Sequence, residues 1–130
     1  MDCAYKPEFA SVSVEGGSVN ITSLDETALL NALFAGGPVS VTLYVASDFR
    51  DYLSGVYSNP SCLSSISSVN HAVVAVGYGV DKDSGMKFWT VKNSWGSDWG
   101  DQGYFKIQRD VNMCGIGVCN SYPYSVVDVS

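Results

Sequence analysis

Residues 70–108 read NHAVVAVGYGVDKDSGMKFWTVKNSWGSDWGDQGYFKIQ, and this stretch decides the fold. It holds three segments rich in Val, Tyr and Phe that are bounded by Gly, Asp, Asn and Ser, a pattern typical of strands: Ala72–Tyr78, Phe88–Lys92 and Tyr104–Gln108. The sequence DKDSG at Asp81–Gly85 predicts a hairpin-type turn between the first two. We therefore expect a mainly antiparallel sheet at the centre of the domain.

The segment Ser23–Phe34 predicts the main helix. Ser23 can cap it, and Glu26 stands three residues later, as in a capping box. Four apolar residues recur at helical spacing and form the expected inner face: Leu29, Leu30, Leu33 and Phe34. The sequence Gly36-Gly37-Pro38 ends the helix.

The rest of the chain adds strands on either side of the central stretch. We expect them at Val39–Val45 and Tyr122–Val127. A short helical turn over Ser47–Leu53 interrupts them, with Ser47 as its cap. Its inward-facing residues are Phe49, Tyr52 and Leu53. The expected fold class is α+β, a strand-rich, antiparallel, barrel-like domain with one main helix.

Length and composition describe one folded unit. The chain has 130 residues, 46% of them hydrophobic and 15% charged, so residues 1–130 can fill a single core and do not resemble a disordered segment. With 7 Lys+Arg against 13 Asp+Glu, the net charge is -6, and no basic cluster could neutralise phosphates. No segment reaches the roughly 20 apolar residues that span a bilayer. We expect neither nucleic acid nor a membrane as a partner.

The four cysteines point to disulfides. Cys3, Cys62, Cys114 and Cys119 are irregularly spaced and form no CxxC pair, which argues against a zinc or redox motif. Disulfides imply an oxidising compartment, but the sequence alone leaves three full pairings open. With a single histidine and no acidic cluster at ligand spacing, we expect no metal and no organic cofactor.

His71 and the amide of Asn93 are the candidate catalytic residues. His71 is the only histidine, and imidazole is the side chain best suited to act as a base near neutral pH. An asparagine oxygen can accept a hydrogen bond from an imidazole N–H and so orient the ring, and an indole can exclude water from that bond. Trp95 and Trp99 follow Asn93 closely. The alternative is a structural histidine beside a tight turn that carries core aromatics.

Several strings, taken in order, resemble the papain-like cysteine proteases, and the cathepsin L-like branch in particular. They are VNHAVVAVGYG from residue 69, FWTVKNSWGSDWGDQGYFKI from residue 88, NMCGIGVCNSYP from residue 112, and upstream GGPVSV and DCAYKPE. The resemblance covers nearly the whole chain. It implies that residues 1–130 are the C-terminal, right-hand domain of that fold, without the N-terminal helical domain.

The resemblance implies a role for each candidate. His71 would be the catalytic base and acid, and Asn93 would orient it. Trp95 would shield their hydrogen bond and form part of the primed-side surface, with Trp99 packed beneath. Thr42 and Val69 would line the substrate pocket for the residue that precedes the scissile one, although ordinary core packing explains both equally well. Cys119 would form the pocket floor and make it small and apolar.

The resemblance also implies a Cys62–Cys114 disulfide, which closes a loop worth about 4 kcal/mol in the chain-entropy model. The counterpart of Cys3 pairs with a cysteine outside this sequence, so Cys3 should be unpaired or bonded between chains. Cys119 has no partner in the family, and a Cys3–Cys119 bond is the alternative. Neither Cys3 nor Cys119 has the neighbouring cation or helix N-terminus that activates a thiol, so neither is expected to replace the nucleophile.

The nucleophile of the family is not in this sequence. Its signature is C-G-[SA]-C-[WY], with the histidine and asparagine about 130–150 residues downstream, which places it roughly 60–80 residues before Met1. The family hydrolyses peptide bonds through a thiol acyl-enzyme. We therefore expect this chain to be the His- and Asn-bearing part of a cysteine endopeptidase, inactive alone. The alternative is a non-catalytic homologue that acts as a structural or binding module.

Partners and compartment follow from the same resemblance. The expected partners are a peptide or protein substrate, the N-terminal half of the protease and cystatin-type inhibitors. An apolar cleft wall that includes Trp95 and Val69 would also favour self-association. The acidic charge balance and the family together suggest a lysosomal, digestive-vacuole or secreted protein.

Overall fold

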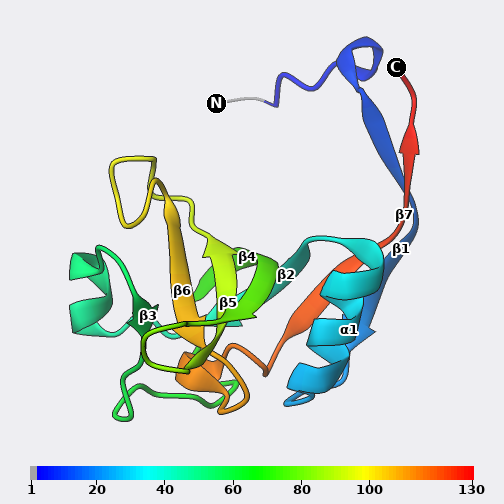
Figure 1. Cartoon of the computed structure of the whole chain (residues 1–130). Helices are drawn as coiled ribbons and strands as arrows, with labels where there is room; N and C mark the ends of the chain where they lie inside the picture. The colour runs from blue at the N-terminus through cyan, green and yellow to red at the C-terminus, as the bar shows by residue number, and fades with distance from the viewer. Residues whose placement is uncertain (1–2) are drawn as a thin grey trace.

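The computed structural model describes residues 3–130, and this part of the chain contains one sheet of seven strands (Figure 1). In chain order the strands are β1 (Val12–Ile21), β2 (Val39–Leu43), β3 (Val56–Tyr57), β4 (His71–Val80), β5 (Lys87–Lys92), β6 (Tyr104–Gln108) and β7 (Asn120–Asp128). Their order across the sheet is β1-β7-β2-β4-β5-β6-β3. Every neighbouring pair is antiparallel except β3 and β6, which are parallel. The α+β, strand-rich fold class is confirmed, although the sheet does not close into a barrel.

The predicted strands are present, with shifted ends. Only Tyr104–Gln108 has its predicted bounds; the strand predicted from Ala72 begins at His71, and the strand predicted to reach Val45 ends at Leu43. The turn at Asp81–Gly85 joins β4 and β5 as predicted, and Asp81 Oδ2 accepts hydrogen bonds from both the backbone N–H and the hydroxyl of Ser84.

Two strands were not predicted. β3 has only two residues, too few for a periodic pattern. β1 is interrupted by Gly16 and Gly17, where the register with β7 shifts, and both glycines have positive φ. A Cβ on Gly16 would lie 2.5 Å from the Tyr124 ring, so glycine is needed for the strands to approach each other here.

The main helix, α1 (Glu26–Gly36), begins later than predicted. Its cap is Asp25, whose side chain accepts a hydrogen bond from the backbone N–H of Ala28 at 2.8 Å. The prediction of Ser23 as cap was wrong because the chain turns at Leu24, which has positive φ, before the helix starts. Leu29 and Leu33 are buried as predicted, but Phe34 is 81% exposed and does not belong to the inner face.

Within the part of the chain that the structure describes there are also three short 3₁₀ helices: η1 (Pro7–Phe9), η2 (Ser47–Asp51) and η3 (Met113–Gly115). The predicted turn from Ser47 is η2, and Phe49 and Tyr52 are buried. Two details were wrong. Ser47 makes no capping bond because the cap position is Ala46, and Leu53 is 76% exposed because the chain has left the helix before reaching it.

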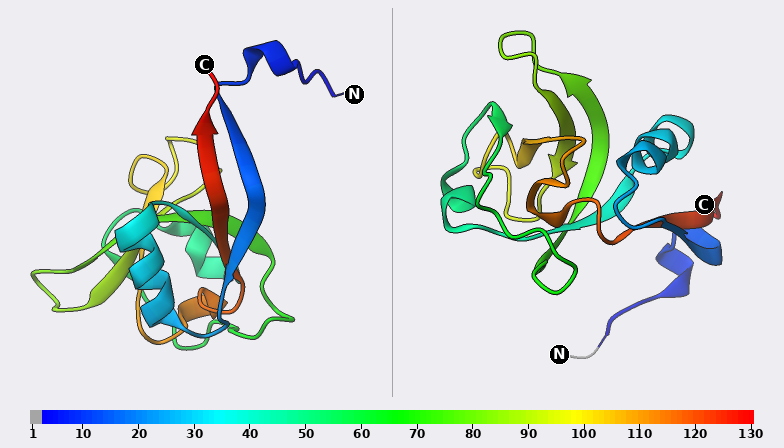
Figure 2. Two further views of the ribbon diagram at one scale, coloured as in Figure 1. Left: turned by 90° about the vertical axis from the view of Figure 1, so that its right-hand side faces the viewer. Right: turned by 90° about the horizontal axis from the view of Figure 1, so that it is seen from below.

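The core lies in the part of the sheet around β2, β4, β5 and β6, and α1 packs beside β2 and β4 (Figure 1). Its fully buried large side chains include Trp89, Phe49, Phe105, Leu29 and Leu43. The far ends of β1 and β7 extend away from this body, and both ends of the described chain leave from there (Figure 2).

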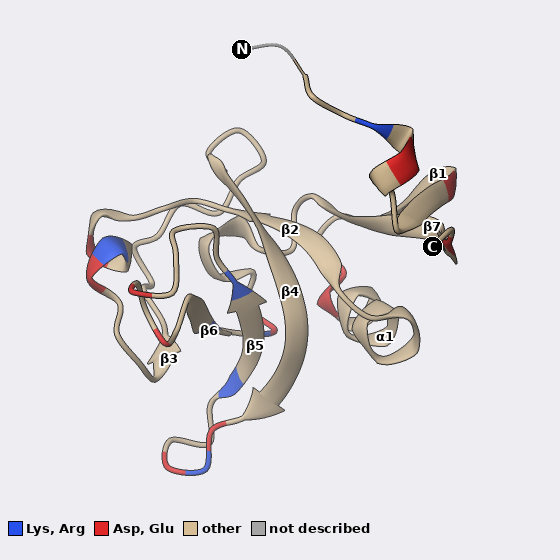
Figure 3. Cartoon of the chain, turned by 90° about the horizontal axis from the view of Figure 1, so that it is seen from above, with Lys and Arg blue, Asp and Glu red and all other residues tan. Residues whose placement is uncertain are grey.

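Acidic and basic residues are spread over several elements (Figure 3). Asp110 forms the ion pairs of the described chain, with Lys87 and Arg109, each at 3.3 Å. Within residues 3–130, no helix is both long enough and apolar enough to cross a membrane.

Candidate active site

His71 is the first residue of β4, and the chain that leads to it is fixed on both sides. Its backbone pairs with Leu43 on β2. The preceding residue, Asn70, donates its backbone N–H to the carbonyl of Leu43 at 3.1 Å, and its side-chain oxygen accepts the N–H of Val45 at 3.0 Å. The start of β4 is therefore attached to the end of β2, and the half-buried imidazole is held at this edge.

Asn93 follows the last residue of β5. Because β4 and β5 are antiparallel, with Val74 opposite Lys92, the start of one strand lies beside the end of the other. The backbone N–H of Asn93 donates to the carbonyl of Gly103 at 2.9 Å, and the residue is only 7% exposed. The hairpin thus brings together two side chains that are 22 positions apart.

The hydrogen bond between these side chains defines the tautomer of the histidine. Asn93 Oδ1 accepts the backbone N–H of Ser94 at 2.8 Å, so this atom must be the amide oxygen, because a backbone N–H cannot accept a hydrogen bond. His71 Nε2 lies 2.9 Å from the same oxygen. Nε2 must therefore donate its proton, which leaves Nδ1 of the neutral ring with a free lone pair. The Asn93 amide accepts this hydrogen bond without placing a formal charge beside the imidazole.

One tryptophan packs on the imidazole, and a second packs on the first. The Trp95 ring stacks on the imidazole, with centroids 5.2 Å apart and planes 27° apart. Trp99 meets Trp95 edge to face at 5.0 Å, and its indole N–H donates to the backbone carbonyl of Arg50 at 2.9 Å. Phe49, which is fully buried, contacts both indoles. The result is an aromatic layer of Trp95, Trp99 and Phe49 packed beside the imidazole.

A hollow of about 250 Å³ opens beside the imidazole. Its lining residues are Val45, Arg50, Asn70, His71 and Trp95. The Arg50 guanidinium lies over the Trp95 ring at 5.4 Å from its centroid. The sequence patterns did not mark Val45, Arg50 and Asn70 as site residues. For Asn70 a signal existed, since it directly precedes the only histidine.

Two buried tyrosines pack against the aromatic residues near His71: Tyr52 contacts Trp99, and Tyr57 contacts Phe49. Tyr52 packs against Trp99 at 5.8 Å, and its hydroxyl donates to the carbonyl of Gly55 at 2.7 Å. Burial raises the pKa of Tyr52, and the carboxylate of Asp101 acts in the same direction. Burial and the hydrogen bond to Asp48 raise the pKa of Tyr57 to about 12. Both phenols are therefore neutral over the ordinary pH range.

The structure gives separate contacts for the three residues predicted to line the substrate pocket, Thr42, Val69 and Cys119. Thr42 Oγ1 lies 3.5 Å from the carbonyl oxygen of Cys119, so these two are neighbours. Val69 packs against Gly115, where its methyl would lie 2.7 Å from a Cβ. The hollow beside His71 does not include Thr42, Val69 or Cys119.

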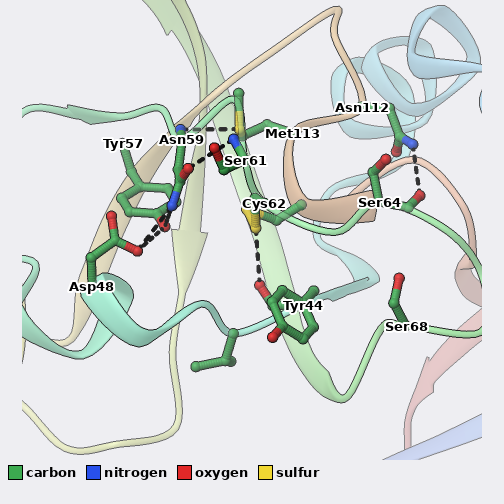
Figure 4. Close-up of a disulfide and its surroundings, with 12 residues drawn as sticks. Tyr44, Asp48, Tyr57, Asn59, Ser61, Cys62, Ser64, Ser68, Asn112 and Met113 are labelled. Atoms are coloured by element: carbon green, nitrogen blue, oxygen red, sulfur yellow. Dashed lines mark hydrogen bonds between the residues drawn. A yellow bond between two sulfur atoms is a disulfide. The ribbon is translucent and has the colours of Figure 1, made fainter.

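The disulfide joins Cys62 to Cys114, with Cα atoms 5.1 Å apart, which is the pairing that the resemblance implies. Figure 4 shows its surroundings, where Asn59 donates its backbone N–H to Met113 Sδ at 3.3 Å and Asn112 Nδ2 donates to the carbonyl of Ser64 at 3.1 Å. The bond fixes the loop that leads to His71 against η3.

The other two cysteines, Cys3 and Cys119, are free and exposed in the structure. Among residues 3–130, no group of three or more His, Cys, Asp or Glu side chains could hold a metal ion.

Comparison with known proteins gives one consistent result. The model of the papain family cysteine proteases matches residues 1–124. Oryzain gamma chain from Oryza sativa subsp. japonica is 54% identical over 121 residues, covering 93% of this chain and 33% of the relative. Pro-cathepsin H from Mus musculus is 50% identical over 121 residues, which cover 93% of this chain and 35% of the relative. The chain thus spans about a third of the length of these curated relatives.

Solved structures agree with the fold. Digestive procathepsin L2 from Tenebrio molitor larval midgut superposes with a TM-score of 0.86 at 40% identity, covering 95% of this chain and 38% of that one. The bromelain protease from Ananas comosus, in complex with the E64 inhibitor, superposes with a TM-score of 0.74 at 39% identity. The match covers 82% of this chain and 49% of that one.

Proposed function

Because this chain belongs to the papain family of cysteine proteases, we propose that it supplies the histidine and asparagine of a cysteine endopeptidase whose nucleophile lies outside this sequence. The observation that supports this most strongly is the bond from His71 Nε2 to Asn93 Oδ1. This bond leaves Nδ1 of the neutral ring as the basic atom, beside an open hollow. In this proposal residues 1–130 are the C-terminal domain, and an N-terminal helical domain provides the other wall of the site.

The proposed chemistry is acyl transfer to a thiol. Nδ1 of His71 takes the proton of the cysteine thiol, and the thiolate attacks the peptide carbonyl. The imidazolium then gives the proton to the leaving amine, which breaks the C–N bond and leaves an acyl-enzyme. A water molecule, deprotonated by the same Nδ1, hydrolyses the thioester. Asn93 holds the ring in position through both proton transfers.

Roles of the neighbouring residues follow from this chemistry. Trp95 shields the His71–Asn93 bond and forms part of the primed-side surface, while Trp99 supports it from below. Thr42, Val69 and Cys119 form one side of the pocket for the substrate residue before the scissile bond. A cysteine at the floor makes that pocket small and favours a small apolar residue.

A chimera tests the proposal directly. This chain replaces the aligned 121-residue part of oryzain gamma chain, and hydrolysis of a fluorogenic peptide is followed. We expect the chimera to be active, and His71→Ala to lower the rate by about 10²–10⁴-fold, the usual contribution of a general acid–base group. Asn93→Ala should lower it about tenfold, the equivalent of one lost hydrogen bond. Asn31→Ala, on the exposed side of α1, is the matched control and should leave the rate unchanged.

Two results would contradict the proposal. The first is an active chimera whose rate is insensitive to His71→Ala. The second is peptide hydrolysis by residues 1–130 alone that is lost in His71→Ala, because this would place the nucleophile within the chain. The alternative of a non-catalytic module is decided by the residue at the nucleophile position of the preceding sequence, where cysteine supports the peptidase.

The partners we propose are a peptide or protein substrate, the N-terminal half of the protease, and cystatin-type inhibitors that enter the same cleft. Trp95 and Val69 are half-buried, and in the isolated chain they give the cleft wall an apolar surface that favours self-association. Sedimentation of the isolated chain tests this last point, since a strictly monomeric chain at high concentration would refute it.

We also propose a compartment. The Cys62–Cys114 disulfide supports an oxidising environment. Together with the acidic charge balance, it favours a lysosomal, digestive-vacuole or secreted protein. Fractionation of the cells that produce the protein would distinguish these three locations, and recovery in the reducing cytosol would contradict all of them.

A further inference from the structure

We propose that Arg50 is a specificity-determining residue, which favours substrates that carry a carboxylate shortly after the scissile bond. This role rests on the acyl transfer proposed above, and it defines the class of leaving group that the site selects. Arg50 lies on η2, within the sequence Ser47-Asp48-Phe49-Arg50-Asp51. Its distance in sequence from His71 gives no hint of a shared site, but in the structure both residues line one hollow.

The hydrogen bond of the imidazole determines where the leaving group must be. His71 Nε2 is occupied by Asn93 Oδ1, so Nδ1 is the atom that gives a proton to the leaving amine. A proton donor must come within about 2.6–3.2 Å of the atom that it protonates. The residue after the scissile bond therefore passes close beside the imidazole, where the hollow of about 250 Å³ is open to receive it.

Arg50 places a positive charge at this hollow. The other lining residues are Val45, Asn70, His71 and Trp95, so Arg50 is the permanent cation among them. The residue is exposed. Within residues 3–130, every ion pair has Asp110 as its acid, so no described carboxylate neutralises the Arg50 guanidinium. A carboxylate of the substrate would be its first ionic partner.

The acids next to Arg50 in the sequence do not compete for it. Asp48 Oδ1 accepts the Tyr57 hydroxyl at 2.8 Å and Asn59 Nδ2 at 3.1 Å (Figure 4). Asp51 is exposed and takes part in none of the described ion pairs. The chain as a whole has a net charge of -6, which repels acidic substrates, but salt screens that repulsion beyond about 8 Å. A close contact with Arg50 therefore outweighs it.

The guanidinium is ordered before a substrate binds. It lies over the Trp95 ring, 5.4 Å from the ring centroid. At the base of the side chain, the backbone carbonyl of Arg50 accepts the indole N–H of Trp99 at 2.9 Å. A stacked guanidinium keeps the N–H groups at its edge available, and they can bind a carboxylate through two parallel hydrogen bonds. Because the side chain is already held, less conformational entropy is lost on binding.

Trp95 also sets the reach of this contact, since the same ring stacks on His71 with centroids 5.2 Å apart. An extended peptide advances about 3.5 Å per residue. The carboxylate that Arg50 binds is therefore carried by the first or second residue after the scissile bond. It is either an acidic side chain or the terminal carboxylate of a short leaving peptide.

The test uses the chimera with oryzain gamma chain described above and two pairs of internally quenched peptides. In the first pair, the residue after the scissile bond is glutamate or glutamine. In the second pair, a neutral leaving dipeptide ends in a free carboxylate or in an amide. The measured quantity is the ratio of kcat/KM within each pair, which does not depend on the fraction of active enzyme. We expect a preference of about fivefold for the carboxylate in at least one pair, as for one ionic contact at a surface.

Variants of Arg50 assign this preference to its side chain. Arg50→Gln should abolish the preference, and Arg50→Lys, which keeps the charge without the planar fork, should retain part of it. Arg50→Glu should reverse it. Lys82→Gln is the matched control, because it removes the same charge from the exposed turn at the opposite end of the β4–β5 hairpin from His71. High salt should weaken the preference of the natural chain.

Two failures are distinguishable. Equal ratios for the natural chain and Arg50→Gln in an active, His71-dependent chimera would overturn the role of Arg50 and leave the proposed function intact. A chimera insensitive to His71→Ala would overturn the proposed function instead.

Binding to the isolated chain tests the role of Arg50 without turnover. Two dipeptide amides, one beginning with glutamate and one with glutamine, are titrated into the labelled chain while NMR follows the indole N–H of Trp95. We expect the glutamate peptide to bind about fivefold more tightly, and Arg50→Gln to remove the difference. Equal responses to the two peptides in the natural chain would overturn the proposal.

Discussion

The indole Nε1 of Trp89 donates a hydrogen bond of 2.7 Å to Oε1 of Glu26. This contact ties the first turn of α1 to β5, at the centre of the sheet. The same carboxylate accepts the backbone N–H of Asp110 at 3.0 Å and, through Oε2, that of Asn112 at 2.7 Å. Glu26 is buried, so its charge is compensated by three donors rather than by a cation.

We expect Glu26→Gln to lower the free energy of unfolding. An amide cannot accept on both arms, so at least one buried N–H is left without a partner, at a cost of about 1–3 kcal/mol. Urea denaturation measures this. Glu15→Gln, on the exposed face of β1, is the matched control and should change stability by less than about 0.5 kcal/mol. Equal stability of Glu26→Gln and the natural chain would show that the three hydrogen bonds to the Glu26 carboxylate do not stabilise the fold.

The helix cap gives a second prediction. Asp25→Ala removes the acceptor of the Ala28 N–H and should cost about 1 kcal/mol. Ser23→Ala, which removes the residue that the sequence pattern favoured as cap, should cost almost nothing. Thermal or urea unfolding of the two variants distinguishes them, and a larger effect at Ser23 would place the helix start two residues earlier.

The pKa of Tyr57, raised to about 12 by burial and by its bond to Asp48, predicts a loss of stability in alkali. A phenol in the unfolded chain has its ordinary pKa of 10.0. The folded chain therefore holds the proton more tightly, so its stabilising effect is complete below pH 10 and is lost as the pH rises toward 12.

Tyr57→Phe should make the free energy of unfolding depend less steeply on pH in this window. Tyr5→Phe, at an exposed position, is the control and should retain the natural slope. An identical slope for Tyr57→Phe and the natural chain would show that Tyr57 does not titrate as described.

The disulfide supports the loop that leads to His71. Replacing Cys62 and Cys114 together by serine should lower the free energy of unfolding by about 4 kcal/mol, the chain-entropy value for a loop of this length. Cys119→Ser removes an exposed, free thiol and is the control, with little expected change. A double variant as stable as the control would indicate that the reduced chain already restricts this loop.

Local patterns predicted much of this fold. The hairpin of β4 and β5 follows from two apolar runs around DKDSG, and Tyr104–Gln108 has its predicted bounds. Local patterns failed where long-range contacts decide the outcome. β1 contains two glycines, and it is a strand because it pairs with β7, whose residues lie 99 to 116 positions later in the sequence.

The candidate site, like the fold, has residues that the sequence marked and residues that only long-range contacts bring into place. The residue types and the order of His71, Asn93 and Trp95 left a structural histidine as the alternative, and the resemblance to the papain-like proteases was needed to expect an oriented imidazole under an indole. Arg50 and Val45 were not predicted, because they reach the hollow through η2 and the end of β2, and nothing local marks them. Glu26 was assigned to a capping box from its spacing, whereas its partners are 63 to 86 positions away.

The proposed acid–base role of His71 depends most on the proton carried by Nε2. Because His71 is the only histidine, nitrogen NMR of the labelled chain reports on it without ambiguity. In the neutral ring we expect a protonated Nε2, an unprotonated Nδ1 and slow exchange of the Nε2 proton with water. Asn93→Ala should make that exchange fast, while Asn31→Ala should not change it. A neutral ring protonated mainly at Nδ1, or a proton that exchanges equally fast with and without Asn93, would contradict the account.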